Sequence, residues 1–274
     1  MPPVSPRAPS ALPTSLNHCN VPPWALAAQE FQANPRLLEL GDVHVTDRRL
    51  WARLASINDA ALRGRVFHDY ISVKFRLHDW PDQTPTAQAC LRHSYVRFLR
   101  NWGADSNGHA GAVLKAWVES RFGLRATYHC GSLATDPVAR ERYDQDRMKA
   151  SAKTMGLSQQ LDLLYTFCQD ELLRRHPDER WLTLYRGTHD PAEYRVRHET
   201  ETGAGKLQLV EFNNLSSFTF DREVAWEFGS SVWEVRVPFA KIFCFTSLLP
   251  PEFLQGESEY LVLGGEYHVR PLLS

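Results

Sequence analysis

The pattern of apolar residues changes from helical to strand-like near Pro177, and this change limits the folds that the chain can adopt. Before Pro177, apolar side chains recur at the spacing of one face of a helix. After it, short runs rich in β-branched and aromatic residues are separated by turn residues. Helices followed by strands, without regular alternation of the two, favour an α+β fold over a doubly wound sheet.

Helical signals run from Trp24 to about residue 175. We expect helices over 24–31, after Thr46 as an N-cap, after Thr84-Pro85, over 110–122 and after Ser158 as an N-cap. Gly103 and Gly123 are expected to end two of them. The aromatic stripes on these helices are best explained by burial in a core.

Short strands are expected after Pro177, over 181–185, 207–212, 232–237, 241–245 and 260–263. A helix over 221–228, with Asp221 as its N-cap, interrupts them. The chain is therefore expected to consist of a flexible Pro- and Ser-rich arm over 1–22, a helical region over 23–177 and a β-rich region over 178–274. We expect the last two to form one compact unit.

Composition argues against several classes of protein. The net charge of the 274 residues is -1, so a general electrostatic affinity for nucleic acid is not expected. The 5 cysteines are far apart and include no C-x-x-C pair, which argues against a disulfide framework or a structural zinc site. The scattered histidines lack metal-ligand spacing, so we expect no metal site.

Neither secretion nor membrane insertion is expected. The N-terminus has no apolar signal-peptide core, and no later segment reaches the roughly 18 uncharged apolar residues of a membrane-spanning helix. We expect a cytoplasmic protein with reduced thiols. Neither a G-x-G-x-x-G sequence after a strand nor a Walker sequence is present, so nucleotide binding of the Rossmann or P-loop kind is not expected.

Polar groups stand at the ends of expected strands in the second half, at 185–188, 215–219 and 257–259. Arg186 ends an apolar strand, where its planar guanidinium suits a phosphate or carboxylate anion. Gly187 allows a ligand to approach the backbone closely. Taken alone, Arg186 is equally well explained by a structural ion pair, since both roles use the same bidentate geometry.

Glu257 and Glu259 lie one residue apart where a polar turn becomes an apolar strand. Side chains two residues apart on an extended chain point to the same face, so both carboxylates are expected to face one site. Like charges this close resist joint ionisation unless a cation lies between them. The simpler alternative is a solvated pair at the start of a strand, and Ser216 and Ser217 taken alone are explained by turn chemistry or capping.

Together and in this order, the arginine, serine and glutamate-x-glutamate elements resemble those of the mono-ADP-ribosyltransferases related to clostridial binary toxins and vertebrate ecto-enzymes. The chain is more closely similar to the arginine-specific dinitrogenase reductase ADP-ribosyltransferase family of nitrogen-fixing bacteria, at 98–108, 184–190, 213–219 and 225–230. This resemblance covers nearly everything after the N-terminal arm. It implies a β-rich core of two small packed sheets.

The resemblance assigns the cofactor side of the site to the arginine element. It implies that Arg186 holds the diphosphate and ribose of NAD and that the backbone of Gly187 contacts the nicotinamide amide, with Thr188 beside them. The helix over 221–228 is expected beneath the nicotinamide and carries Phe228. NAD is therefore the expected co-substrate.

The serine element departs from the family pattern. That pattern is Ser-Thr-Ser, whereas this chain has Ser-Ser-Phe-Thr at 216–219. Either Ser216 or Ser217 therefore matches the motif serine that braces the catalytic glutamate, and we favour Ser217. Both are expected at the cofactor site.

The resemblance makes Glu259 the catalytic acid and Glu257 the residue that receives a target arginine. Cleavage of the nicotinamide bond generates an oxocarbenium-like ribose, which a carboxylate on the ribose 2′-hydroxyl stabilises. A guanidinium is protonated and a poor nucleophile, so Glu257 is expected to orient it and to assist removal of a proton.

The implied activity is transfer of ADP-ribose from NAD to an arginine of dinitrogenase reductase, which releases nicotinamide and reversibly inactivates nitrogen fixation. The resemblance also implies a PII-type nitrogen signalling protein as a partner, and the long helical region is the expected docking place. The enzymatic alternatives are NAD glycohydrolysis and transfer to an arginine of another protein. The non-enzymatic alternative is an inactive binding module that has kept the fold.

Overall fold

The computed structural model describes residues 18–77, 94–151, 156–189, 194–202, 205–254 and 258–272. Its helices are α1 (Pro23–Ala27), α2 (Gln29–Ala33), α3 (Val43–Thr46), α4 (Arg48–Ala55), α5 (Ala60–Lys74), α7 (Tyr95–Ala104), α8 (His109–Phe122), α9 (Pro137–Ser151), α10 (Leu157–Arg175) and α11 (Arg222–Glu227). Its strands are β1 (Trp181–Thr188), β2 (Arg195–Thr202), β3 (Gly205–Thr219), β4 (Ser231–Pro238), β5 (Ile242–Phe245) and β6 (Glu259–Leu272). Helices precede strands, which confirms the α+β class.

The strands form a single 6-stranded sheet in the order β2-β3-β1-β4-β6-β5, with β3 also paired to β6. The additional pairing links β1, β4, β6 and β3 into a ring. The arrangement differs from the expected two small sheets because β3 and β6 are long and run through both halves. The first half of β6 pairs with β5 and its last residues pair with β4.

A bulge in β3 fastens the sheet to the helices. The register between β3 and β6 shifts after Phe212, at the buried pair Asn213 and Asn214. Asn213 donates through Nδ2 to the carbonyl of Tyr128, and Asn214 donates to the carbonyl of Lys115 in α8. Buried amides are stable only when such partners are present, so these bonds fix both the bulge and the position of α8.

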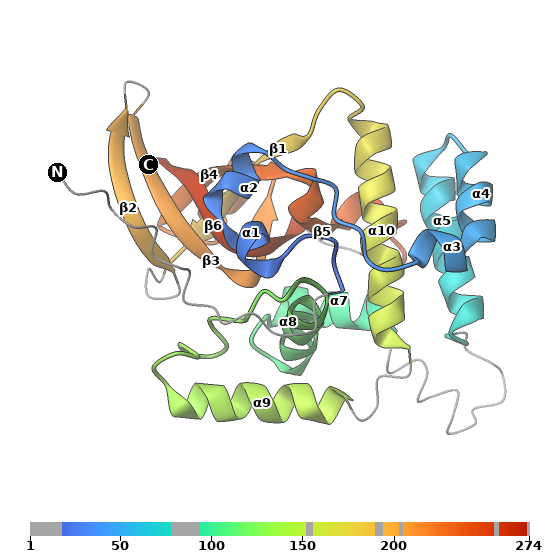
Figure 1. The fold of residues 1–274 in the computed structure, drawn as a ribbon, viewed down its shortest axis with the longest axis horizontal. Coiled ribbons are helices and arrows are strands. Elements are labelled where there is room, and N and C mark those ends of the chain that lie inside the picture. Colours follow the sequence, from blue (N-terminus) through green and yellow to red (C-terminus); the bar gives the residue numbers. More distant parts are fainter. Residues whose placement is uncertain are drawn as a thin grey trace.

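Helices and strands share one hydrophobic core. In Figure 1, α10 stands between the strands and the group α3 to α5, and α8 lies against the sheet with α9 on its outer side. Trp117 of α8 packs on Phe243 of β5 with ring centroids 4.7 Å apart, and Phe67 of α5 stacks on Phe167 of α10 at 4.2 Å. The aromatic stripes of the helices are therefore core, as expected.

Several expected helix ends are confirmed and others are shifted. Gly123 follows α8 in the left-handed conformation at φ 70°, and Asp221 caps α11 by accepting from the backbone of Glu223 and Val224. The expected caps Thr46 and Ser158 are wrong, because α4 begins after Asp47 and α10 after Gly156. The expected helix over 24–31 is broken between α1 and α2 by an extended residue, Ala28. The expected helix start at Thr84-Pro85 lies outside the described residues.

Several elements have no individual counterpart in the sequence analysis, among them α5, α9 and β2. Helix α9 is strongly polar, and strand β2 reads Arg-Val-Arg-His-Glu-Thr-Glu-Thr, with no apolar alternation. Strand β2 is an edge strand that pairs only with β3 in the described sheet, so its side chains need not be apolar.

Part of the expected N-terminal arm is packed. Residues 1–17 lie outside the described chain, but Val21 belongs to the core and Cys19 forms a β-bridge with Leu40. The packed region therefore begins before the expected boundary at residue 22. No helix in the described ranges is long and apolar enough to cross a membrane.

Replacing Asp221 with alanine is expected to destabilise the protein by about 1 kcal/mol, because the first turn of α11 loses its capping acceptor. In a thermal unfolding experiment this corresponds to a midpoint lower by about 2–4 °C for a chain of this size. Asp221→Asn is the matched control, since asparagine caps equally well. Equal midpoints for the two variants would contradict the capping role.

Candidate active site

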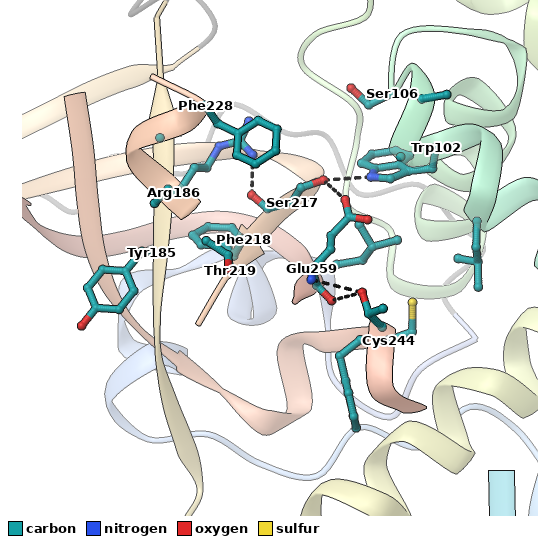
Figure 2. Close-up of a pocket in the computed structure, with 18 of the residues that line it drawn as sticks. Trp102, Ser106, Tyr185, Arg186, Ser217, Phe218, Thr219, Phe228, Cys244 and Glu259 are labelled. Carbon is teal, nitrogen blue, oxygen red and sulfur yellow. Dashed lines mark hydrogen bonds between the residues drawn. The ribbon is translucent and has the colours of Figure 1, made fainter. Parts of the chain in front are cut away.

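A cavity of about 730 Å³ opens where the ends of β1, β3 and β6 meet α7 and α11. Figure 2 shows Arg186, Ser217 and Glu259 gathered in this cavity. Trp102 lies on the side of Ser217 that faces away from Arg186. The residues of the sequence prediction that line the cavity are Arg186, Gly187, Thr188, Ser217, Phe228 and Glu259. Side chains from distant parts of the chain therefore converge in one concave site.

Glu259 is the first residue of β6 and is held from two sides. Its Oε1 accepts a hydrogen bond from Ser217 Oγ at 2.6 Å, and Ser217 Oγ accepts from Trp102 Nε1 at 2.9 Å. Its backbone N–H donates to Thr246 Oγ1 at 3.1 Å, and this hydroxyl donates to the carbonyl of Glu259 at 3.3 Å. The carboxylate is thus fixed before any ligand arrives.

Burial raises the pKa of Glu259 above its ordinary value. The hydrogen bonds from Ser217 and Trp102 and the positive charge of Arg186 act in the opposite direction and lower it. The balance leaves the pKa raised, so ionisation of Glu259 in the site carries a free-energy cost that these three groups reduce.

Arg186 lies at the end of β1 and is oriented by uncharged oxygens. Its Nε donates to the hydroxyl of Tyr194 at 2.8 Å, and its Nη1 donates to the carbonyl of Ser217. The guanidinium also lies near two aromatic rings, with its central carbon 5.2 Å from the ring centroid of Tyr194 and 5.8 Å from that of Phe218. Such contacts hold the planar guanidinium in one orientation.

The structure shows a packing role for Gly187, while its expected contact with nicotinamide stays a prediction. A Cβ atom at Gly187 would lie 2.0 Å from the carbonyl oxygen of Ala225, and one at Gly229 would lie 2.1 Å from the backbone nitrogen of Thr188. Both glycines therefore allow α11 to pack directly on β1. This close packing holds Phe228, whose side chain is 59% exposed, at the wall of the cavity.

The two candidate serines point to different sides of β3, as residues on a strand do. Ser217 lies in the cavity, whereas Ser216 is 3% exposed, does not line the cavity and has no hydrogen-bond partner for its Oγ within the described residues. The structure thus brings Ser217 to Glu259 and places Ser216 away from the expected cofactor site.

Glu257 lies outside the described residues, so its expected role stays a prediction. The argument that placed it on the same face as Glu259 assumed an extended chain. Ser258 instead has φ 54°, in the left-handed region, and β6 begins only at Glu259. Alternation of side chains along a strand therefore does not apply to this pair.

The sequence analysis did not assign Trp102, Tyr194 or Thr246 to the site. Trp102 comes from α7, Tyr194 directly precedes β2, and Thr246 begins the short 3-10 helix after β5. Trp102 falls in one of the stretches that carried the family resemblance, which is the one signal that pointed to it. In the described part of the chain, no group of three or more His, Cys, Asp or Glu residues is placed to hold a metal ion.

Arginine, serine and glutamate converging in one cavity of an α+β fold is the residue set of the mono-ADP-ribosyltransferases. The model of the family "Dinitrogenase reductase ADP-ribosyltransferase (DRAT)" matches residues 16–271. The NAD(+)--dinitrogen-reductase ADP-D-ribosyltransferase of Rhodospirillum rubrum is 36% identical over 267 residues, which cover 93% of this chain and 94% of that relative. The chain belongs to the dinitrogenase reductase ADP-ribosyltransferase family. No solved structure matches it.

Removing the Ser217 hydroxyl is expected to raise the pKa of Glu259 further, because the first of the groups that lower it is lost. A carboxyl-carbon NMR titration of Ser217→Ala measures this shift directly. Ser216→Ala is the control, because the Ser216 hydroxyl has no hydrogen-bond partner in the described residues. In this variant the titration midpoint of Glu259 is expected to equal that of the parent protein. An unchanged midpoint in Ser217→Ala would contradict the hydrogen bond.

Proposed function

We propose that this protein transfers ADP-ribose from NAD to an arginine of dinitrogenase reductase, releasing nicotinamide and reversibly inactivating nitrogen fixation. The observation that carries the proposal is the fixed carboxylate of Glu259, hydrogen-bonded to Ser217 in the same cavity as Arg186. The activity for which the Rhodospirillum rubrum relative is named supports it, because that sequence aligns along nearly the whole chain.

The cavity suits NAD in size and in chemistry. Its volume of about 730 Å³ lies within the range of small-molecule and cofactor sites. Arg186 supplies the positive charge for the diphosphate, and its contacts with Tyr194 and Ser217 pre-orient it. Phe228, Gly187 and Thr188 line the wall on which we place the nicotinamide and its ribose.

Glu259 acts on the ribose. As the bond between ribose C1′ and the nicotinamide nitrogen breaks, its electron pair leaves with nicotinamide and positive charge develops on the sugar. A carboxylate that accepts a hydrogen bond from the 2′-hydroxyl stabilises this charge. Ser217 and Trp102 hold the carboxylate in place, so little reorganisation is needed during the reaction.

A guanidinium of the target protein then attacks C1′. One of its nitrogens forms the new bond and releases one proton, which makes nicotinamide and the ADP-ribosylated arginine the products. We assign the orientation of this guanidinium and assistance in removing its proton to Glu257. NAD glycohydrolysis uses the same carboxylate but has water as the nucleophile, so capture of the ribose by protein is the point to be tested.

We also propose that the protein acts in the cytoplasm and that a PII-type nitrogen signalling protein regulates it. No described residue of helices α3 to α5 or of α9 lines the cavity, so we assign docking of the target and of such a regulator to the solvent-exposed faces of these helices.

Incubation with NAD and dinitrogenase reductase is expected to modify one arginine, located by peptide mass spectrometry. Glu259→Gln is expected to lower kcat/KM for transfer by about 10²–10³-fold, the usual effect of losing one transition-state contact. Equal transfer by the parent protein and Glu259→Gln, or no modification by the parent, would contradict the proposal.

Glu259→Gln is expected to be at least as stable as the parent protein at neutral pH. Since burial raises the pKa of Glu259, the folded state binds its proton more tightly than the unfolded state does. The ionised carboxylate therefore destabilises the fold at neutral pH, and this penalty is relieved as the pH falls through the raised pKa. The neutral amide of Glu259→Gln removes this penalty. Urea unfolding of both proteins at neutral pH measures the resulting difference in the free energy of unfolding.

Arg186→Lys is expected to raise the KM for NAD by about tenfold, because an ammonium lacks the planar fork that matches a phosphate. Tyr194→Phe, which keeps the guanidinium but removes its hydroxyl partner, is expected to have a smaller effect in the same direction. Initial rates at varied NAD concentration measure both. A larger effect from Tyr194→Phe would contradict the assignment of Arg186.

Glu257→Gln separates transfer from hydrolysis. We expect this variant to lose transfer to protein arginine while it still cleaves NAD into nicotinamide and ADP-ribose. Release of nicotinamide without acceptor and labelling of dinitrogenase reductase are measured side by side. Loss of both activities would assign Glu257 to NAD cleavage and not to the acceptor.

A further inference from the structure

The segment before the glutamate element is held by helices that come much earlier in the chain. Residues 250–254 form a turn in which the backbone nitrogens of Phe253 and Leu254 both donate to the carbonyl of Pro250. Leu254 lines the cavity, and Phe253 lies beside it, half-buried against the main core. The turn therefore forms part of the cavity wall.

Helix α5 approaches this turn closely. A Cβ atom at Gly64 would lie 2.9 Å from the carbonyl oxygen of Leu248 and 3.0 Å from Cδ of Pro250, so a larger residue would push the two segments apart. One helical turn further on, the ring of His68 stacks on Phe253 with centroids 3.6 Å apart and an interplanar angle of 20°. This stack is the closest aromatic pair in the described structure.

The imidazole of His68 is itself fixed on the side away from the turn. Its Nδ1 lies 2.8 Å from the hydroxyl of Tyr95, a fully buried residue at the start of α7, and its Nε2 lies 3.4 Å from Ser72 Oγ. Burial raises the pKa of Tyr95, so this hydrogen bond joins a neutral hydroxyl to the imidazole. The ring of His68 is thus set in one orientation beneath Phe253.

Helix α7 holds the backbone of the same turn. Arg100 donates through Nε to the carbonyl of Phe253 and through Nη2 to the carbonyl of Glu252, each at 3.0 Å. Arg65 of α5 pairs with the side chain of Glu252 at 2.8 Å, but both are about half exposed and such a pair contributes little. The ring stack of His68 on Phe253 and the two hydrogen bonds from Arg100 are therefore the main contacts that hold the turn at 250–254.

These contacts are independent of those that hold Glu259. Glu259 is fixed by Ser217 and Thr246, neither of which contacts His68 or Phe253 through any hydrogen bond or ring contact described for them. His68 does not line the cavity. A change at His68 is expected to move Phe253 and, with it, the cavity wall at the adjacent Leu254, while the carboxylate of Glu259 keeps its place.

We propose that His68 is a positioning residue for the acceptor arginine. By stacking on Phe253, it fixes the turn whose Leu254 forms the part of the cavity wall along which the target guanidinium reaches the ribose. The inference rests on the proposed function, because NAD occupies the wall of Arg186 and Phe228 in that proposal and the acceptor enters on the remaining side. His68 acts through Phe253 and touches neither NAD nor the reacting atoms. Loss of the His68 ring weakens transfer of ADP-ribose to protein and leaves NAD binding and NAD hydrolysis unchanged.

The test compares His68→Ala with the parent protein in three measurements. These are the acceptor kcat/KM with dinitrogenase reductase at saturating NAD, the Kd for NAD by calorimetry, and release of nicotinamide without acceptor. We expect the acceptor kcat/KM to fall about three- to tenfold, the range of one lost aromatic pair. The Kd for NAD and the rate of nicotinamide release without acceptor are expected to change less than about twofold, because His68 is independent of the groups that hold Glu259.

Two further variants separate positioning from loss of fold. Tyr95→Phe combined with His68→Phe keeps a ring on Phe253 and removes both partners of the buried hydrogen bond, so it is expected to transfer at nearly the parent rate. His68→Ala added to Phe253→Ala is expected to cause no further loss beyond Phe253→Ala alone, because residues that act through one contact are not additive.

Each outcome decides the inference. Equal losses of transfer and of nicotinamide release, an unchanged acceptor kcat/KM in His68→Ala, or additive losses in the double variant would overturn it. Failure of the parent protein itself to modify dinitrogenase reductase would overturn the proposed function instead. Transfer by the parent with no effect of His68→Ala overturns the positioning role alone.

Discussion

The burial of the Glu259 carboxylate among polar partners is the constraint on which the rest of the structure depends. Burial alone raises the pKa of Glu259 and opposes the charged form. Hydrogen bonds from Ser217 and through it from Trp102, with the nearby charge of Arg186, reduce that penalty. These groups come from β3, α7 and β1, so the site exists only when the sheet and the helices are assembled together.

The helical part of the chain is therefore a component of the active site and not an appendage to it. It shares one hydrophobic core with the sheet, and buried amides of the β3 bulge bond to the backbone of α8 and of the loop that follows. Trp102 donates to Ser217 next to the Glu259 carboxylate, and His68 stacks on Phe253 in the turn that precedes it. Any partner that displaces α5 or α7 acts on the site through these contacts.

The parts of the site that the sequence predicted are those placed by local structure. Arg186, Ser217 and Glu259 stand at strand ends or along strands whose apolar pattern is readable, and they converge in the cavity. Trp102 and Tyr194 carry no local pattern that marks them, because each reaches the site through packing between elements distant in sequence. The expected pairing of Glu257 with Glu259 assumed an extended backbone, which Ser258 does not adopt.

The sequence by itself determined the order of helices and strands and the helix ends at Asp221 and Gly123, because these depend on propensities and spacings within a few residues. The residues of the site were indicated by the resemblance to a known family. Only the tertiary structure decided that β3 pairs with β6, that polar β2 joins the edge of the sheet, and that Ser217 faces Glu259 while Ser216 does not. Strand register and the facing of side chains follow from which surfaces are buried together, and that is settled by contacts between residues far apart in the chain.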